Sequence, residues 1–405
     1  MRTSAFRACF KVLSVAFFRN TAVNLLNLHY GIHAVALSGG EAFFLIYLLR
    51  AGVPVTAVLL SLAVILLGRF VIRPCVVAGA ARWGLRKMVV AGTLLSALTY
   101  PLISEVHGIG VPLAALIVVA AIASTVYWTT YHAYFARLGD DEHRGQQIGA
   151  REAIAAVVSV VSPLLTGWML VTFGPRAAFG VTAVITVAAA VPLLWAPDVE
   201  VRRHVPGVFR AALPSVLLFA ADGCIGAGNV FVWQIALFVS IGESFIGYGT
   251  AMAVAALVGA VGSMTLGRHI DAGHGKRAAR YALGLLALVV ALRAAAVGHA
   301  ALAVLANATG ALSYCLYIPT VMTPIYTMAK RSPCTLRFHI ATEGGWDLGG
   351  AVALLLAALA TALRLPLPVG ILPAFPGVLA ITVLLRRYYA RAPARPAAVG
   401  QTSEY

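Results

Sequence analysis

Residues 54–80 read PVTAVLLSLAVILLGRFVIRPCVVAGA, and nearly every side chain in this run is apolar. A helix needs roughly 20 such residues to cross the hydrocarbon core of a bilayer, so the run is long enough to span a membrane. Its only charged side chains are Arg69 and Arg73, which would stand about one helical turn apart. The run therefore predicts a transmembrane helix that carries two basic groups close to one face.

The rest of the 405-residue chain repeats this pattern, with short polar junctions between apolar runs. Of all residues, 61% are hydrophobic and only 11% are charged, whereas an ordinary soluble domain is about a quarter charged. We therefore expect an all-α polytopic membrane protein with about twelve transmembrane helices. The expected spans are residues 23–49, 54–80, 87–104, 110–136, 149–172, 176–196, 211–239, 244–267, 279–298, 300–328, 338–362 and 366–388.

The two halves of the chain are similar to each other at an offset of roughly 190 residues, which indicates a duplicated six-helix unit. Residues 39–44 align with 227–232, 86–87 with 276–277, and 150–152 with 341–343. The longest polar junction near the middle, residues 196–210, separates six runs from six. We expect two pseudo-symmetric six-helix bundles at 1–197 and 211–390, a cytoplasmic linker at 198–210 and a cytoplasmic tail at 391–405.

The formal net charge is +16, and the basic residues fall in bursts at alternate junctions between the apolar runs. Only four of the 30 basic residues, Arg50, Arg176, Arg293 and Arg364, fall towards the other side. By the positive-inside rule this asymmetry places both termini in the cytoplasm. Anionic lipid headgroups are the expected contacts of the basic bursts, and nucleic acid is not an expected partner. A bacterial inner membrane is the expected location.

The sequence contains no pattern of a nucleotide-driven pump, and its cysteines have no metal-site spacing. It has no GxxxxGK[ST] phosphate-binding loop, so ATP drive would need another subunit. The five cysteines are scattered without the spacing of zinc ligands or of a disulfide framework. We expect no cofactor and no metal, and a solute gradient or a gradient of protons or another ion as the energy source.

The junction between the second and third runs reads ARWGLRK at 81–87, and its counterpart in the second half has Gly267, Asp271 and then GKR at 275–277. The fifth run, residues 149–172, contains Ser162-Pro163 and Gly167 and is followed by FGPR at 173–176. In these features and in the repeat, the chain resembles the major facilitator superfamily over nearly its whole length. The resemblance implies a monomeric transporter whose spans one, four, seven and ten line a central cavity. It also implies that span two packs beside span eleven and span five beside span eight.

The function expected from these features is secondary transport of a small solute by rocker-switch alternating access, with proton coupling. The alternative is a non-transporting integral-membrane enzyme or a lipid-handling membrane protein. An enzyme would need an acid/base pair or a metal site at one membrane face, and the HxxxH pattern of His29 and His33 is the only candidate. Because no further acidic residue lies nearby, we expect no enzymatic activity.

Three ionisable side chains inside the expected spans are candidates for the coupling group: Glu41, Asp222 and His33. A lone charge at the bilayer centre costs roughly 2.5–3.5 kcal/mol, and low-dielectric surroundings favour the neutral carboxyl, which suits reversible protonation of Glu41. Simpler roles stay open, namely solvation or a static arginine partner for Glu41, helix-end hydrogen bonding for Asp222, and ordinary hydrogen bonding for His33. The repeat pairs Glu41 with the uncharged Asn229.

The substrate cavity is expected to be lined mainly by aromatic and polar side chains of the paired spans. The expected set is Arg69, Tyr127, Trp128, Tyr131, Asn229, Trp233, Tyr314 and Tyr317. Each aromatic residue could equally serve only in packing. Arg69 is expected to favour an anionic or zwitterionic substrate, whereas Arg73 is expected to pair with acids of span eleven. Arg293 is expected to snorkel outward.

A cytoplasmic gate is expected from the pseudo-symmetry of two acids and two basic clusters. The expected gate residues are Arg73, Arg82, Arg86, Glu152, Arg268, Asp271, Lys276, Glu343 and Asp347. Glu343 would meet Arg73, Arg82 or Arg86, and Glu152 would meet Arg268 or Lys276. Asp347 could replace the acid that the family motif has at Ala81. The alternative is that these are ordinary positive-inside charges with solvated partners.

Overall fold

The computed structural model describes residues 20–139, 144–201, 207–270 and 275–391. For residues 144–150, 152, 264–270, 275–278, 335, 336 and 391 it describes the backbone alone. All regular structure within these ranges is helical, and twelve helical segments are long and apolar enough to cross a membrane. The expected all-α fold with twelve spans is confirmed.

The first six spans are built from nine helical elements. These are α2 (Thr21–Val35), the π-helix η1 (Ala36–Glu41), α3 (Ala42–Arg50), α4 (Val55–Trp83), α5 (Leu85–Ser104), α6 (Val111–Leu138), α7 (Arg144–Thr172), and α8 (Pro175–Ala190) with the 3₁₀ turn η2 (Val191–Trp195). Span one is continuous from α2 through η1 to α3. The expected ends of the spans differ from these bounds by a few residues, because polar side chains continue a helix beyond its apolar core.

The last six spans repeat this arrangement. They are α9 (Val208–Gly226), the π-helix η3 (Ala227–Val232) and α10 (Trp233–Ser240), then α11 (Phe245–Ile270), α12 (Gly275–Ala296), α13 (Ala300–Lys330), α14 (Thr335–Ala362), the 3₁₀ turn η4 (Leu367–Gly370) and α15 (Ala374–Arg391). Span seven is continuous from α9 to α10, as span one is from α2 to α3.

Short turns join the spans, and the turn after α4 shows how the sequence ends a helix. Helix α4 ends at Trp83, and Gly84 follows with φ 84°, in the left-handed region that glycine adopts without steric cost. A β-carbon at Gly84 would also overlap the carboxyl group of Asp198. Glycine is therefore required here both for the turn and for the close approach of Asp198.

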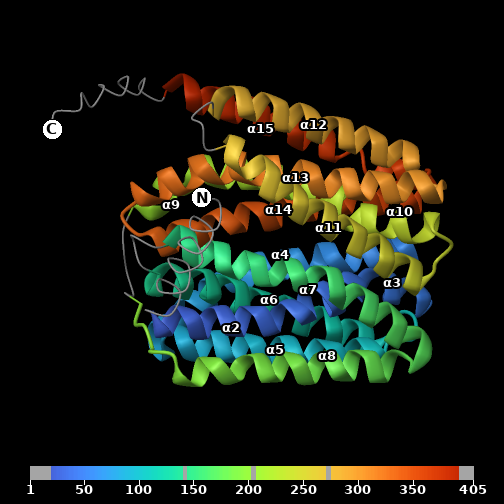
Figure 1. Cartoon of the computed structure of the whole chain (residues 1–405), viewed down its shortest axis with the longest axis horizontal. Coiled ribbons are helices and arrows are strands. Elements are labelled where there is room, and N and C mark those ends of the chain that lie inside the picture. Colours follow the sequence, from blue (N-terminus) through green and yellow to red (C-terminus); the bar gives the residue numbers. More distant parts are fainter. Residues whose placement is uncertain (1–19, 140–143, 202–206, 271–274, 392–405) are drawn as a thin grey trace, which may run out of the picture.

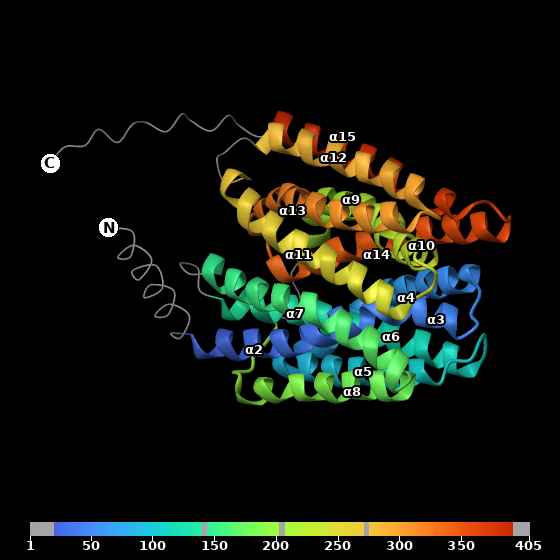
Figure 2. The same cartoon turned by 45° about the vertical axis from the view of Figure 1, so that its right-hand side comes forward.

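The helices form two bundles that meet along four of the spans. Figures 1 and 2 show α2, α5 and α8 side by side at one edge of the molecule and α12 with α15 at the opposite edge. Between them, α4 packs against α14 and α7 packs against α11. These are the two cross-bundle contacts that the family resemblance implies. The start of α2 and the end of α15 lie at the same end of the molecule, which we call the α2 end (Figure 1).

Apolar packing joins the bundles at the opposite end, which we call the α3 end. One buried cluster there combines residues of both halves, and the ring of Phe43 lies 5.3 Å from that of Tyr248. Two other buried clusters each belong to one half, one between Val23 and Ala196 and one between Val208 and Leu385. The apolar cores of the halves are thus continuous at the α3 end and separate elsewhere.

Spans one and seven share a local departure from α-helical geometry. Each contains a six-residue π-helix near its middle, and η3 begins at Ala227, 191 residues after η1 begins at Ala36. π-Helical segments widen the turn, release backbone carbonyls, and are frequent at functional sites. In this register Glu41 corresponds to Val232, so the sequence pairing of Glu41 with Asn229 was wrong by three residues. Three residues are close to one helical turn, so the short sequence match could not resolve the shift.

Candidate functional site

A cavity of about 650 Å³ lies between the two halves. Its wall includes residues of η1, α3 and α4 from the first half, and residues of η3, α10 and α12 from the second. Cavities of roughly 300–1,000 Å³ are typical of sites for small-molecule ligands. The cavity is thus large enough for a metabolite-sized solute, and both halves would contact that solute.

Glu41 is the acidic residue of the cavity wall. It is the last residue of η1, well inside span one, and yet its side chain is exposed, so the space that it faces is the cavity. Beside it, the hydroxyls of Ser38 and Ser159 are 2.9 Å apart and join η1 to α7. Among the described residues, no basic group lies within ion-pair distance of the Glu41 carboxylate.

Arg293 also borders the cavity, and the expectation that it snorkels outward was wrong. Although it lies in the last turn of α12, only 4% of its surface is exposed. Its guanidinium donates a hydrogen bond to the backbone carbonyl of Asn229 in η3 and lies 5.0 Å from the centre of the Trp233 ring. A backbone carbonyl of the π-helix and an aromatic face hold the side chain inward, which sequence position alone could not indicate.

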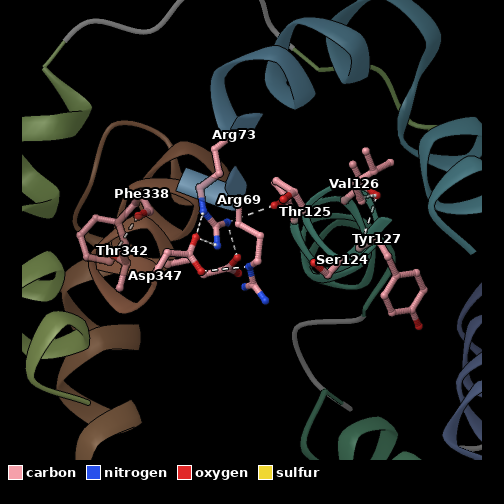
Figure 3. A network of polar contacts seen from close by, with 12 residues as sticks. Arg69, Arg73, Ser124, Thr125, Val126, Tyr127, Phe338, Thr342 and Asp347 are labelled. Carbon is pink, nitrogen blue, oxygen red and sulfur yellow. Dashed lines mark hydrogen bonds and ion pairs between the residues drawn. The ribbon is translucent and has the colours of Figure 1, made fainter. Parts of the chain in front are cut away.

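A network of ion pairs joins α4 to α14 across the boundary between the halves (Figure 3). Arg73 donates from Nε to Asp347 over 2.7 Å and from Nη1 to Glu343 over 2.6 Å. It also donates to the hydroxyl of Thr129 on α6, at 3.2 Å. Asp347 is fully buried, and Arg73 is nearly so. A guanidinium with two carboxylates is a charge-assisted arrangement of fixed geometry.

Arg69 borders the cavity, as expected, and it also pairs with an acid of span eleven, as was expected of Arg73. It borders the cavity, and its Nε lies 3.0 Å from Oδ1 of Asp347. Its guanidinium also lies 5.8 Å from the centre of the Trp346 ring. Figure 3 shows the side chains of Arg69 and Arg73 converging on Asp347. Because Asp347 neutralises Arg69, that charge is already balanced within the protein.

Of the remaining residues of the expected gate, the two whose side chains are described, Arg82 and Arg86, do not join this network. Arg82 is exposed, and Arg86 bonds within its own half, donating to the carbonyls of Leu194 and Ala196 at 3.3 and 3.1 Å. The expected pairing of Glu343 is thus met by Arg73 and not by Arg82 or Arg86. Asp271 and the side chains of Glu152, Arg268 and Lys276 lie outside the described residues.

The expected aromatic lining divides into two groups. Trp128, Trp233 and Tyr314 border the cavity, as does Asn229. Tyr127, Tyr131 and Tyr317 do not; they are buried behind the wall with at most 1% of their surface exposed. Successive residues of a helix point about 100° apart, so neighbours such as Tyr127 and Trp128 face different surroundings. Because of this rotation along the helix, the three tyrosines face away from the cavity that they were expected to line.

Two of the three expected coupling residues lie away from the cavity wall. His33 is 1% exposed and packs against the rings of His29 and Tyr127, whose hydroxyl lies 3.0 Å from Nε2 of His29. Asp222 accepts a hydrogen bond from the hydroxyl of Tyr317 within the second half. Of the three, Glu41 alone borders the cavity.

Tyr100 and Asn307 are two of the polar wall residues that sequence reasoning missed. The hydroxyl of Tyr100 donates to the carbonyl of Ala36 in η1 at 3.3 Å. Asn307 accepts from Nε1 of Trp233 at 3.0 Å and donates to the carbonyl of Ala251 at 3.1 Å. An amide inside the apolar run that begins span ten was the available signal for Asn307. No such signal distinguished Tyr100 from a packing tyrosine.

Comparisons with known proteins agree on the type of fold. The sequence model described as Major Facilitator Superfamily matches residues 32–337. No curated protein sequence matches the chain. Solved structures are similar over nearly the whole chain at low sequence identity. An auto-inhibited POT family peptide transporter has a TM-score of 0.69, with 12% identity, 93% of this chain and 99% of that chain covered.

Two further structures are similar to the same extent. The POT family transporter PepTSo has a TM-score of 0.67, with 12% identity, 92% of this chain and 99% of that chain covered. A point mutant of the nucleoside transporter NupG has a TM-score of 0.63, with 12% identity, 91% of this chain and 100% of that chain covered. At such identities the likeness concerns the fold alone.

Proposed function

The chain belongs to the major facilitator superfamily of membrane transporters, and on that basis we propose that it carries a small solute across the bilayer by alternating access. In this proposal residues 1–197 rock against residues 211–405, and a proton gradient drives the movement. Family membership indicates transport rather than catalysis. We further propose that the protein works as a monomer in a bacterial inner membrane, with both termini in the cytoplasm and with anionic lipids around its basic junctions.

Two observations together support this proposal. A cavity lies between the halves, and the halves pack differently against each other at the α3 end and at the α2 end. At the α3 end, apolar side chains of both halves form one buried cluster, and Arg50 lies 3.6 Å from Glu243 across the boundary. Towards the α2 end the apolar cores are separate and ion pairs connect α4 with α14. An end held by a few ion pairs can open without separating a continuous apolar core.

Glu41 is the proposed coupling group. Its carboxylate is exposed to the cavity and forms no ion pair in the described part of the chain, although it feels the charge of Arg69. A carboxyl group in low-dielectric surroundings is stabilised by protonation, so it can take up a proton from an aqueous cavity and release it on the other side. Of the expected coupling residues, Asp222 and His33 are supported less well, because neither borders the cavity.

Arg73, Glu343 and Asp347 are the proposed gate of the α2 end, which by the basic asymmetry is the cytoplasmic end. Breaking a buried ion pair leaves uncompensated charges, so these contacts favour the closed arrangement. The conformational equilibrium of a transporter depends on a few kcal/mol, and a gate of this size is enough to bias it.

The proposed function is tested by finding a solute that both binds and is transported. The purified protein would be screened by thermal shift against classes of metabolites, since a ligand at 100 times its dissociation constant stabilises the bound form by about 2.7 kcal/mol. A stabilising solute would then be offered to proteoliposomes with and without an inward proton gradient. We expect accumulation only in liposomes that contain the protein, and more of it with the gradient. Binding without any uptake or exchange would contradict a transport function.

A further inference from the structure

Arg293 is a buried cation for which the described part of the chain supplies no anion. It is 4% exposed, and its hydrogen-bond acceptor is a neutral backbone carbonyl, that of Asn229. Its Nε has no hydrogen-bond partner among the described atoms, although the side chain borders the cavity. Burying an unpaired charge is costly, and such charges in membrane spans usually mark a ligand or ion pathway.

The other charges of the cavity wall make Arg293 distinctive. The charged side chains among the described lining residues are Glu41, Arg69 and Arg293. Arg69 is balanced by Asp347, which is in turn bonded to Arg73, and Arg73 also binds Glu343. This group of two arginines and two acids is neutral as a whole. This leaves two charged lining residues without an ion pair, Glu41 in the first half and Arg293 in the second half.

A comparison with the first half supports a specific role for the guanidinium. In the first half, Tyr100 of span three donates to the carbonyl of Ala36 in η1. In the second half, Arg293 of span nine also donates to a carbonyl of the π-helix, that of Asn229 in η3, two residues beyond the 191-residue register of the two π-helices. A neutral phenol is therefore sufficient to satisfy the carbonyl of a π-helix. The charge at Arg293 needs a different explanation.

We propose that Arg293 binds the carboxylate group of a singly charged anionic solute, and that this solute crosses the membrane together with one proton carried by Glu41. The proposal rests on the proposed transport function and specifies its substrate class. A guanidinium presents its N–H groups in a planar fork that matches a carboxylate. The adjacent rings of Trp233 and Tyr314 would contact the apolar body of the solute.

The charge balance of the cavity explains why the two species would move together. Without solute, ionised Glu41 and Arg293 sum to zero. A bound carboxylate alone leaves a net charge of −1, and a proton on Glu41 alone leaves +1. With both, the sum is again zero. Enclosing a net charge in low-dielectric surroundings is unfavourable, so the empty and the doubly loaded protein are the forms that change conformation readily.

The first test measures binding and does not depend on transport. Purified full-length protein would be titrated by thermal shift, at constant ionic strength, with benzoate, phenylacetate and butyrate, each beside its own primary amide. We expect at least one carboxylate to stabilise the protein and its amide not to do so. In Arg293→Gln that carboxylate should bind at least about tenfold more weakly, which corresponds to loss of one charge-assisted hydrogen bond.

Two variants make the binding result interpretable. Arg293→Lys keeps the positive charge but lacks the planar pair of N–H donors. It should bind the carboxylate more weakly than the native protein and more tightly than Arg293→Gln. If the glutamine variant does not fold, the lysine variant still tests the role of Arg293. Arg176→Gln is the matched control, because Arg176 pairs with Glu105 at 2.9 Å outside the cavity. It should bind as the native protein does. No stabilisation by any of the three carboxylates, or equal binding by Arg293→Gln, would overturn the proposal.

The second test separates this proposal from the proposed function. In proteoliposomes, a carboxylate that binds should be taken up under an inward proton gradient faster than it enters protein-free liposomes as the neutral acid. A membrane potential set with potassium and valinomycin should not change this protein-dependent rate, because one anion and one proton cross together. Uptake that follows the potential would overturn the coupled movement. Uptake of a solute without a carboxylate that persists in Arg293→Gln would overturn the substrate class and leave transport standing. Binding that depends on Arg293 without any uptake would instead contradict transport.

Discussion

At the scale of single residues, Glu41 is the proposed coupling group, because it is the lining carboxylate with no ion-pair partner in the described ranges. Glu41→Gln imitates the protonated form permanently. We expect it to abolish accumulation driven by a proton gradient while solute binding and exchange without a gradient persist. Uptake and counterflow in proteoliposomes measure the two activities separately.

The control for Glu41 is Glu105→Gln, since Glu105 lies in the turn between α5 and α6 and is paired with Arg176. It should accumulate the solute as the native protein does. Accumulation by the Glu41→Gln variant that still follows the proton gradient would show that another group carries the proton.

Glu343 and Arg73 form an ion pair of the proposed gate, with 2.6 Å between the charged atoms, and both side chains are largely buried. Removing one partner of a buried pair typically costs about 3–5 kcal/mol. Glu343→Lys places a second cation beside Arg73 and should shift the population towards the form open at the α2 end. Adding Arg73→Glu restores opposite charges and should reverse much of the shift.

Spin labels placed on opposite halves at the α2 end would measure this population through double electron–electron resonance distances. Lys330→Glu is a suitable control, since Lys330 is exposed at the end of α13 and charge reversal there should leave the distances unchanged. Identical distances in the native protein and in Glu343→Lys would refute the assignment of the gate.

At the scale of helices, close packing of α9 on α14 depends on small residues. A β-carbon at Gly349 would overlap the backbone carbonyl of Ala220, and one at Gly223 would overlap that of Trp346. Small residues allow membrane helices to approach closely, where contacts between backbones stabilise the pair. Asp347 lies on α14, as Gly349 does, so the position of α14 also determines the geometry of the proposed gate.

Gly349→Val should therefore destabilise the protein by about 1–3 kcal/mol, the usual cost of overpacking, and lower its melting temperature in detergent. Gly284→Val in α12 is the matched control, because a β-carbon at Gly284 meets no atom within 4 Å. Equal melting temperatures for the two variants would indicate that α9 and α14 can separate freely.

At the scale of the whole molecule, orientation follows from the distribution of basic residues. If the α2 end is cytoplasmic, Arg50 at the end of α3 and His107 in the turn before α6 face the outside. Single cysteines introduced at these two positions, in a background without the five native cysteines, should react with an impermeant maleimide added to intact cells. Lys330→Cys should react only after permeabilisation. The reverse pattern would invert the proposed orientation.

The sequence by itself determined the number of spans, their approximate ends and the family. A span must match the thickness of the hydrocarbon core with a continuous apolar run, and this requirement is local in the chain. It also identified Glu41, Arg69 and Arg73, because a charge inside such a run is unusual enough to be read without a structure. The ion pairs of Arg73 with Glu343 and Asp347 followed once family packing placed span two beside span eleven.

Only the tertiary structure decided which face of each helix borders the cavity. Adjacent residues point about 100° apart, so a change of one residue in phase separates Trp128 in the wall from Tyr127 behind it. The π-helices η1 and η3 alter this phase in the middle of spans one and seven. Arg293 turns inward because the carbonyl of Asn229 and the ring of Trp233 hold it there. These contacts join helices far apart in the chain, and no local pattern of residues encodes them.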